Sequence, residues 1–264
     1  RVVVIGGGPA GLEAALVAAL RGHRVELHER DATLGGQARW VGHVPAMREL
    51  AKIIAWQEAQ LAKLQVVVRR NSPVTPAAVA ALDADAVIVA TGARTRRPTV
   101  PGAGAIPVLS PEDVVQGAPA KAGIAVVSDE SGLYGAIGAA EVLLGRGVAV
   151  HLVTPSFMAA EDMDVVRRVP VYQRLAQAGC HMHPNRRLAR IEGGAAVLAS
   201  VYDGPEERIA GVDAIVVWHG RDAEDGLRAA LDARGGEVHW IGDSVAPRQL
   251  DIAMAEGAMA GRAV

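Results

Sequence analysis

Three glycines near the start of the chain have the spacing of a phosphate-binding turn. Gly6, Gly8 and Gly11 fit the pattern G-x-G-x-x-G and follow the branched apolar run Val2-Val3-Val4-Ile5. In such a turn the first glycine permits a tight bend. The second lets the backbone approach a diphosphate, and the third lets the following helix pack closely on the strand. The spacing therefore predicts a site for the diphosphate of a nucleotide.

The residues after this turn supply further parts of a nucleotide site. Pro9 and Ala10 begin a predicted helix over 9–21, whose N-terminal N–H groups and dipole attract phosphate. A second predicted strand over 24–28 ends at Glu29, eighteen positions after Gly11, where a carboxylate accepts hydrogen bonds from an adenosine ribose. The acid disfavours a 2′-phosphate, but the neighbouring Arg30 leaves that choice open. A glycine-rich turn without a ligand is the alternative, and the ordered context of the motif favours the nucleotide.

Hydrophobic periodicity predicts the elements that position these residues. Buried parallel strands read as continuous branched apolar runs, whereas helices repeat apolar residues every three to four positions. Strands and helices alternate along the chain, which predicts an α/β fold. The predicted strands are 2–5, 24–28, 65–68, 85–91, 124–127, 148–153, 213–218 and 238–241, with short strands within 187–202, and the predicted helices are 9–21, 46–64, 132–144, 165–178, 223–233 and 249–263.

Composition excludes several classes of protein. The chain has 264 residues, half of them hydrophobic, and a formal net charge of −2, so nothing in its charge favours nucleic acid. Cys180 is the only cysteine, which excludes an internal disulfide, a C-x-x-C dithiol and an iron–sulfur cluster held by this chain. We expect no metal site and no membrane span, and we expect a cytoplasmic protein. The chain begins one residue before its first strand, which predicts a piece of a longer polypeptide.

A second strand–turn–helix unit has lost its glycines. A Pro- and Gly-rich segment from Pro98 to Pro111 marks a domain boundary, and a second βαβ pattern follows it. Its turn carries Asp129, Glu130 and Ser131 where glycines would admit a diphosphate, and the two carboxylates repel phosphate. The next strand ends in Val153-Thr154-Pro155 without an acid or an arginine for a ribose. We therefore expect no tight NAD(P)H binding there.

Several further motifs accompany the first turn. They are Gly35-Gly36-Gln37, Thr91-Gly92-Ala93, and Gly242-Asp243 followed by Pro247-Arg248. Together they resemble the two-dinucleotide-binding-domain flavoproteins, and in particular the C-terminal half of old-yellow-enzyme-like iron–sulfur flavoenzymes. That group contains 2,4-dienoyl-CoA reductase, the trimethylamine and dimethylamine dehydrogenases and N-methylproline-type demethylases. The degenerate second turn resembles the amine dehydrogenase and demethylase branch.

The resemblance implies two Rossmann-like domains, the second inserted in the first, as in disulfide oxidoreductases. Residues 1–100 and 213–264 would form an FAD-binding domain, and residues 101–212 an inserted NAD(P)-binding-like domain. The resemblance gives Glu29 the adenosine ribose, residues 6–11 the diphosphate and Asp243 the ribitol side of FAD. Gly36, Gln37, Thr91, Gly92 and Gly242 complete the implied site. Capping of the last helix is the alternative role of Asp243.

The expected function is an FAD-binding redox or electron-transfer module of a larger flavin-dependent oxidoreductase, of the amine dehydrogenase, demethylase or enoate reductase type. The resemblance implies that an N-terminal barrel carrying FMN and a 4Fe-4S cluster precedes this region. We assign no catalytic residue within the chain itself. The alternatives are a domain that holds ADP structurally, and a docking scaffold for an electron-carrier protein or for the barrel.

Overall fold

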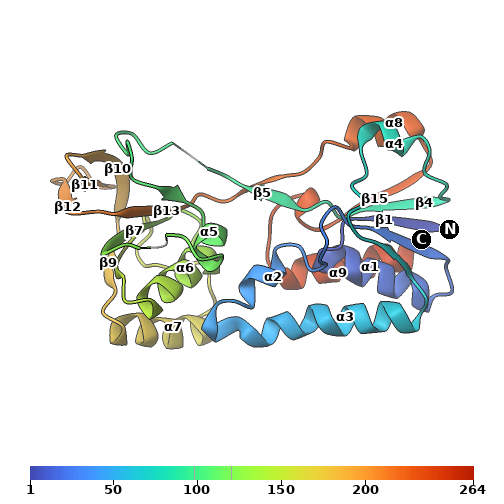
Figure 1. The fold of residues 1–264 in the computed structure, drawn as a ribbon, viewed down its shortest axis with the longest axis horizontal. Coiled ribbons are helices and arrows are strands. Elements are labelled where there is room, and N and C mark those ends of the chain that lie inside the picture. The colour runs from blue at the N-terminus through green and yellow to red at the C-terminus, as the bar shows by residue number, and fades with distance from the viewer. Residues whose placement is uncertain (98, 120) are drawn as a thin grey trace. The chain divides into compact units, whose positions relative to one another are not determined.

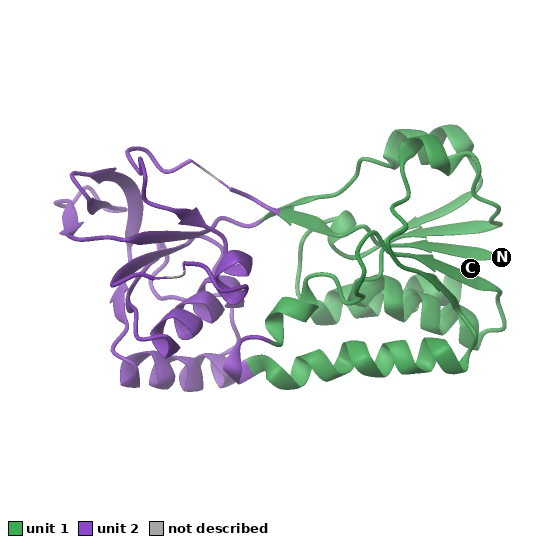
Figure 2. Ribbon diagram, in the orientation of Figure 1, with its two compact units in different colours: residues 1–42, 47–94, 221–264 green, residues 43–46, 95–220 purple. Residues whose placement is uncertain are grey.

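The computed structural model describes residues 1–97, 99–119 and 121–264, and it confirms the α/β class. The chain divides into two compact units, which Figure 2 shows in different colours. Unit 1 comprises residues 1–42, 47–94 and 221–264, and unit 2 comprises residues 43–46 and 95–220. Each unit contains a five-stranded sheet of its own.

The sheet of unit 1 consists of parallel strands only. Its order is β15 (Glu237–Trp240), β4 (Ala86–Val89), β1 (Val2–Ile5), β2 (Val25–His28) and β3 (Val67–Arg69). All four residues of β1 are buried, as expected for a strand covered on both faces. Because the strands are parallel, their carboxyl ends meet at one edge of the sheet. The chain order reverses between β1 and β4, where α/β sheets commonly bind ligands.

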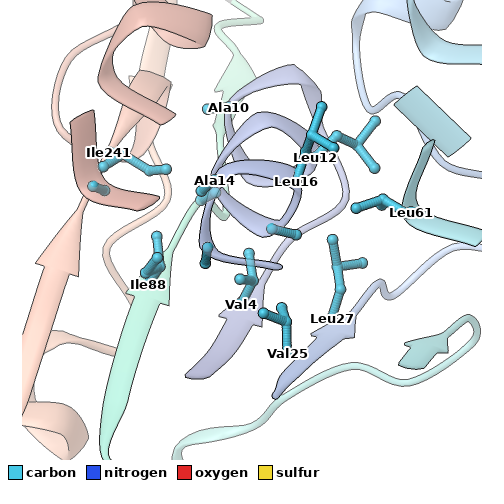
Figure 3. Close-up of a cluster of buried hydrophobic side chains, with 14 of the residues drawn as sticks. Val4, Ala10, Leu12, Ala14, Leu16, Val25, Leu27, Leu61, Ile88 and Ile241 are labelled. Atoms are coloured by element: carbon cyan, nitrogen blue, oxygen red, sulfur yellow. The ribbon is translucent and has the colours of Figure 1, made fainter. Parts of the chain in front are cut away.

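Helices cover both faces of this sheet. On one face lie α1 (Pro9–Leu20), α3 (Ala51–Lys63) and α9 (Leu250–Ala263), and on the other α4 (Pro76–Val79) and α8 (Arg228–Arg234) (Figure 1). Figure 3 shows Leu12 and Leu16 of α1 above Val4 and Leu27 of the strands. These side chains form the core that fixes the start of α1 against the sheet.

Glycines let α9 approach α1 unusually closely. An added Cβ on Gly257 would lie 2.3 Å from the carbonyl oxygen of Ala10, and one on Gly261 would lie 2.7 Å from that of Ala14. Both obstacles are backbone atoms, which cannot rotate away as a side chain could. The contact therefore fixes the first turn of α1 against α9.

We expect Gly257→Ala to destabilise unit 1 by about 2 kcal/mol, because the new methyl group forces the two helices apart. Gly226→Ala is the matched control, since an added Cβ at that exposed glycine meets no atom within 4 Å. Urea denaturation of both variants measures the difference. Equal midpoints for Gly257→Ala and Gly226→Ala would show that the helices can separate without cost.

Unit 2 also has a parallel sheet, but different elements pack on its two faces. Its sheet order is β6 (Val108–Leu109), β13 (Ala214–Trp218), β7 (Ile124–Asp129), β8 (Ala149–Val153) and β9 (His181–His183). One face packs on α5 (Pro111–Val115), α6 (Tyr134–Gly145) and α7 (Val165–Gln177). The other face packs on an antiparallel sheet of β10 (Arg186–Glu192), β11 (Ala195–Ser200) and β12 (Glu207–Ile209).

Three histidines gather on β8 and β9. His151 stacks on His181 with ring centroids 4.8 Å apart, and its Nδ1 lies 2.9 Å from Nε2 of His183. His183 in turn places Nδ1 2.8 Å from Oε1 of Glu207. Burial lowers the pKa of His151 from its ordinary 6.5, and positive charge on His183 and His181 would lower it further.

The stability of unit 2 should consequently fall as the pH drops through about 6.5, because the unfolded chain takes up a proton that folded His151 disfavours. The contribution is fully present above that pH. His151→Phe keeps a stacked ring without a titrating group and should flatten the stability profile between about pH 7 and 5. His23→Gln, outside the cluster, is the control. An unchanged slope in His151→Phe would contradict the assignment.

The structure corrects several predicted boundaries. The helix predicted over 46–64 opens as a 3₁₀ turn, η1 (Pro45–Leu50), before α3 begins. The helix predicted over 223–233 starts only at Arg228, because β14 (Arg221–Ala223) pairs with β5 (Ala93–Thr95) and Glu224 N–H donates to Gly92 O. The short elements α2 (Ala38–Val41), α4, α5, β5, β6 and β14 were not predicted, since two to five residues carry little periodicity.

The described residues lack two kinds of feature. Within ranges 1–97, 99–119 and 121–264, no helix has the length and apolar character to cross a membrane. The same residues contain no group of three histidine, cysteine or acidic side chains arranged to hold a metal ion. Burial raises the pKa of the Cys180 thiol to about 11.

Candidate functional site

All the predicted site residues belong to unit 1, at or beside the carboxyl edge of its sheet. Gly6 follows β1, Glu29 follows β2, Thr91 lies two residues beyond β4 and Gly242 lies two residues beyond β15. Hydrogen bonds continue the ladder past the strands, with Gly6 N–H donating to His28 O (2.8 Å) and Ala90 N–H to Ile5 O (2.8 Å). One sheet edge thus gathers residues that lie more than 200 positions apart.

Two of the three motif glycines are required by the fold. An added Cβ on Gly6, whose φ is +108°, would lie 2.2 Å from the carbonyl oxygen of Ala90. On Gly11 it would lie 1.9 Å from the carbonyl oxygen of Gly6. The obstacles are again backbone atoms, so neither position accepts a side chain. These glycines let the turn pass between β1, β4 and α1.

Gly8 is different, because space in front of it is open. An added Cβ there meets no atom within 4 Å, and its backbone has an ordinary φ of −76°. Gly8 is the N-cap of α1 and Pro9 its first residue. Leu12 N–H bonds to Gly8 O (2.9 Å), while helix geometry leaves the N–H groups of Ala10 and Gly11 for an acceptor outside the helix. Those donors suit a phosphate.

The Gly35-Gly36-Gln37 segment folds back onto the motif. Gly35 N–H donates to Gly7 O (2.8 Å), and an added Cβ on Gly36 would lie 3.2 Å from Gly8 Cα. The amide of Gln37 donates to Ala93 O through Nε2 (2.6 Å), beyond the end of β4. Its Oε1 is buried, and no described residue donates to it. A buried acceptor without a donor is expensive, which points to a ligand group at this position.

Glu29 is a buried carboxylate held by backbone N–H groups. Only 6% of the residue is exposed. Oε2 accepts from Gly7 N–H (2.7 Å) and Oε1 from Asp31 N–H (2.8 Å). Each carboxylate oxygen can accept a further bond, and vicinal hydroxyls of a ribose are donors of the right kind. The structure therefore fixes the carboxylate next to the motif turn in a single orientation.

Arg30, Thr91 and Gly92 have other partners in the structure. Arg30 is largely exposed and lies 3.5 Å from Glu224 Oε1. The hydroxyl of Thr91 donates to Glu224 O (2.7 Å), and Glu224 N–H donates to Gly92 O (2.9 Å). The side chain of Thr91 thus links the segment after β4 to Glu224, which follows β14. Gly92 has a φ of +79°, which favours glycine.

Asp243 lies three residues beyond β15, in the 3₁₀ turn η2 (Gly242–Ser244). An added Cβ on Gly242 would come within 2.9 Å of Ala10 Cβ, so this turn contacts the first turn of α1. Asp243 Oδ1 accepts from Arg248 N–H (3.0 Å), and Oδ2 is 3.6 Å from Arg221 Nη1. Helix α9 has Gln249 as its N-cap, so the alternative of Asp243 as a helix cap is wrong.

Sequence reasoning missed residues that support Glu29. Gly7 donates the N–H that orients the carboxylate, and an added Cβ would lie 2.5 Å from Leu34 Cδ2. Its position between two motif glycines was an available signal. Arg39 bonds to Thr33 Oγ1 (2.6 Å) and Asp31 Oδ2 (2.7 Å) and stacks on Trp40, beside the same loop. Nothing in local periodicity marks these polar residues.

The geometry defines a class of protein. A parallel sheet whose order reverses beside a glycine turn, an open helix N-terminus and a buried acid at the end of the second strand form a dinucleotide-binding fold. The donors of the first turn, the fixed Glu29 carboxylate and the unsatisfied Gln37 oxygen fit the phosphates, ribose and polar edge of such a ligand.

Comparison with known proteins gives the family. Residues 1–243 match the model of the pyridine nucleotide-disulphide oxidoreductases. The chain therefore belongs to that family, which confirms the resemblance seen in the sequence. N,N-dimethylglycine/sarcosine dehydrogenase of Chromohalobacter salexigens is 33% identical over 242 residues, covering 88% of this chain and 35% of that protein. A probable N-methylproline demethylase of Rhizobium meliloti is 35% identical, covering 83% of this chain and 33% of that protein.

A solved structure supports the same grouping. The 6-hydroxypseudooxynicotine amine oxidase of Pseudomonas geniculata N1 superposes with a TM-score of 0.91 at 30% identity, covering 98% of this chain and 41% of that one. The chain spans about a third of the length of the curated relatives described above. It thus corresponds to one part of larger oxidoreductases.

Proposed function

We propose that unit 1 binds FAD and serves as a redox or electron-transfer module within a larger flavin-dependent oxidoreductase. The observation that carries this proposal is the buried Glu29 carboxylate, held by Gly7 and Asp31 N–H groups beside an open glycine turn. Relatives named as a dehydrogenase and a demethylase of methylated amines favour an enzyme of the amine dehydrogenase or demethylase type. Enoate reduction is the alternative reaction.

Different residues of the site would bind different parts of FAD. The N–H groups of Ala10 and Gly11 bind the diphosphate, with Gly6 and Gly8 making room, and Glu29 accepts the adenosine ribose hydroxyls. Arg30 lies at the outer edge. Gln37 Oε1, together with the backbone of Gly36, Thr91 and Gly92, faces the flavin side, and Gly242 and Asp243 face the ribitol. A bound flavin supplies the electron transfer, and the protein supplies its position and polarity.

We further propose an FAD domain interrupted by an inserted domain. The sequence places their limits at 1–100 with 213–264 and at 101–212, whereas the compact units of the structure place residues 213–220, with β13, in unit 2. An FMN barrel with a 4Fe-4S cluster would be the partner within the full-length enzyme, and an electron-carrier protein a second partner. A cytoplasmic location stays a prediction of the sequence. The competing function is a structural one, in which unit 1 holds ADP and takes no part in electron transfer. It competes because Glu29 and the glycine turn recognise only the ADP half of FAD.

Nucleotide identification tests the proposal. The purified protein is incubated with FAD and ADP, freed of unbound ligand, denatured, and its released nucleotide identified by mass and visible absorption. We expect FAD in a one-to-one ratio. Release of ADP alone would favour the structural function. Release of neither, from protein shown to be folded, would contradict nucleotide binding and leave the docking scaffold.

A further inference from the structure

The family to which the chain belongs is named for pyridine nucleotides, so unit 2 invites the same test of fit as unit 1. In its sheet the order reverses between β7 and β13, and α6 follows β7 (Figure 1). A nucleotide in a unit of this kind lies at the carboxyl ends of those two strands, over the start of that helix. The residues at this position do not fit such a ligand.

A carboxylate of the chain occupies the loop between β7 and α6. Asp129, the last residue of β7, is 0% exposed. Its Oδ1 accepts from Ser131 N–H (3.0 Å), Gly132 N–H (3.1 Å) and Ser131 Oγ (3.2 Å). Consecutive loop N–H groups before a helix are the donors that a bound phosphate would use. Here they converge on a carboxylate supplied by the strand itself.

An indole covers the neighbouring strand end. Trp218, the last residue of β13, pairs in register with Asp129 and is 6% exposed. An added Cβ on Gly135, in the first turn of α6, would lie 2.5 Å from the Trp218 ring. Trp218 packs with Val127 and Ala136 in the core on the helix side of the sheet. The indole and the carboxylate therefore stand side by side where the ligand would lie.

The loop that contains Asp162 contacts the turn between β7 and α6. Asp162 N–H donates to Gly132 O (3.1 Å), and an added Cβ on Gly132 would lie 2.9 Å from Asp162 Oδ2. Ala159 and Ala160 are buried. Burial raises the pKa of Asp129, and the surrounding N–H groups of Ser131 and Gly132 oppose that rise. The turn is thus enclosed on several sides.

From this arrangement we propose that unit 2 is a closed dinucleotide-binding unit, in which the Asp129 carboxylate replaces the nucleotide phosphate and Trp218 fills the space beside it. The unit binds neither NADH nor NADPH. Reducing equivalents consequently reach a cofactor in this protein from a substrate or a partner protein, without a pyridine nucleotide held in unit 2.

Calorimetric titration of the full chain with NADH and NADPH tests the binding statement. Wild type and Gly8→Val are compared, because the second variant removes the proposed site of unit 1. We expect no saturable heat in Gly8→Val up to about 1 mM nucleotide. Binding seen only in wild type belongs to unit 1 and agrees with the proposal. Binding that persists in Gly8→Val would overturn it, whatever the outcome for FAD.

Variants of the loop test the replacement of phosphate. Asp129→Ala frees the loop N–H groups and should lower the unfolding midpoint of unit 2, and inorganic phosphate should restore part of the loss. Glu130→Ala, which removes an exposed carboxylate from the same loop, is the matched control and should show neither effect. If Asp129→Ala does not fold, Asp129→Asn is used, which keeps one acceptor oxygen. Equal midpoints and equal phosphate responses in the Asp129 and Glu130 variants would overturn the assignment.

Discussion

Gly11→Ala should strongly destabilise unit 1. The new Cβ would lie 1.9 Å from the carbonyl oxygen of Gly6 and 3.1 Å from Ala90 Cβ, so α1 would have to move away from β1 and β4. Those elements form the centre of the sheet and of its largest core. We expect a loss on the order of 4 kcal/mol, a large share of the stability of an ordinary domain. Circular dichroism during urea denaturation measures it.

The control for this prediction is Gly226→Ala, in the same unit, where an added Cβ meets no atom within 4 Å. It should change the unfolding midpoint little. A Gly11→Ala protein as stable as Gly226→Ala would mean that α1 does not rest on the turn as described.

Gly8→Val should keep the fold and lose the nucleotide. No protein atom lies within 4 Å of an added Cβ, and the backbone at φ −76° and ψ 178° suits a β-branched residue. Loss of a glycine N-cap costs about 1 kcal/mol at most. The side chain would instead occupy the space from which a diphosphate approaches Ala10 and Gly11 N–H groups. We expect FAD or ADP affinity to fall at least about 100-fold, measured by titration calorimetry.

Gly145→Val provides the comparison for Gly8→Val. Gly145 is an exposed helix-end glycine of unit 2 with no neighbour within 4 Å of an added Cβ. That variant should bind nucleotide as wild type does. Because Gly11→Ala acts through the fold and Gly8→Val through the ligand, the two variants separate the structural and functional requirements of one motif. Undiminished nucleotide binding in Gly8→Val would contradict the proposed position of the diphosphate.

Local patterns in the sequence predicted the central elements well. The apolar run of β1 and the glycine turn are short-range signals, and the strand and the helix α1 follow from them within one residue. The acid at the end of β2 was found because its distance from the turn is set by one helix and one strand. The α/β class followed from the alternation of such elements.

Contacts between distant segments could not be predicted from the sequence. The bonds of Glu224 to Thr91 and Gly92, which delay the start of α8, join residues more than 130 positions apart. The loss of glycines around Asp129 was visible, but its carboxylate inside the turn and the indole of Trp218 over Gly135 depend on how β7 pairs with β13. A single sequence carries no local periodicity for such pairs.

A crystal structure of the protein grown with FAD tests the central claim most directly. The account predicts the diphosphate over the first turn of α1, within hydrogen-bond distance of Ala10 and Gly11 N–H groups, and the adenosine ribose on the Glu29 carboxylate. A structure with the nucleotide elsewhere, or with side chains closing the space before Gly8 and Glu29 turned to solvent, would contradict it.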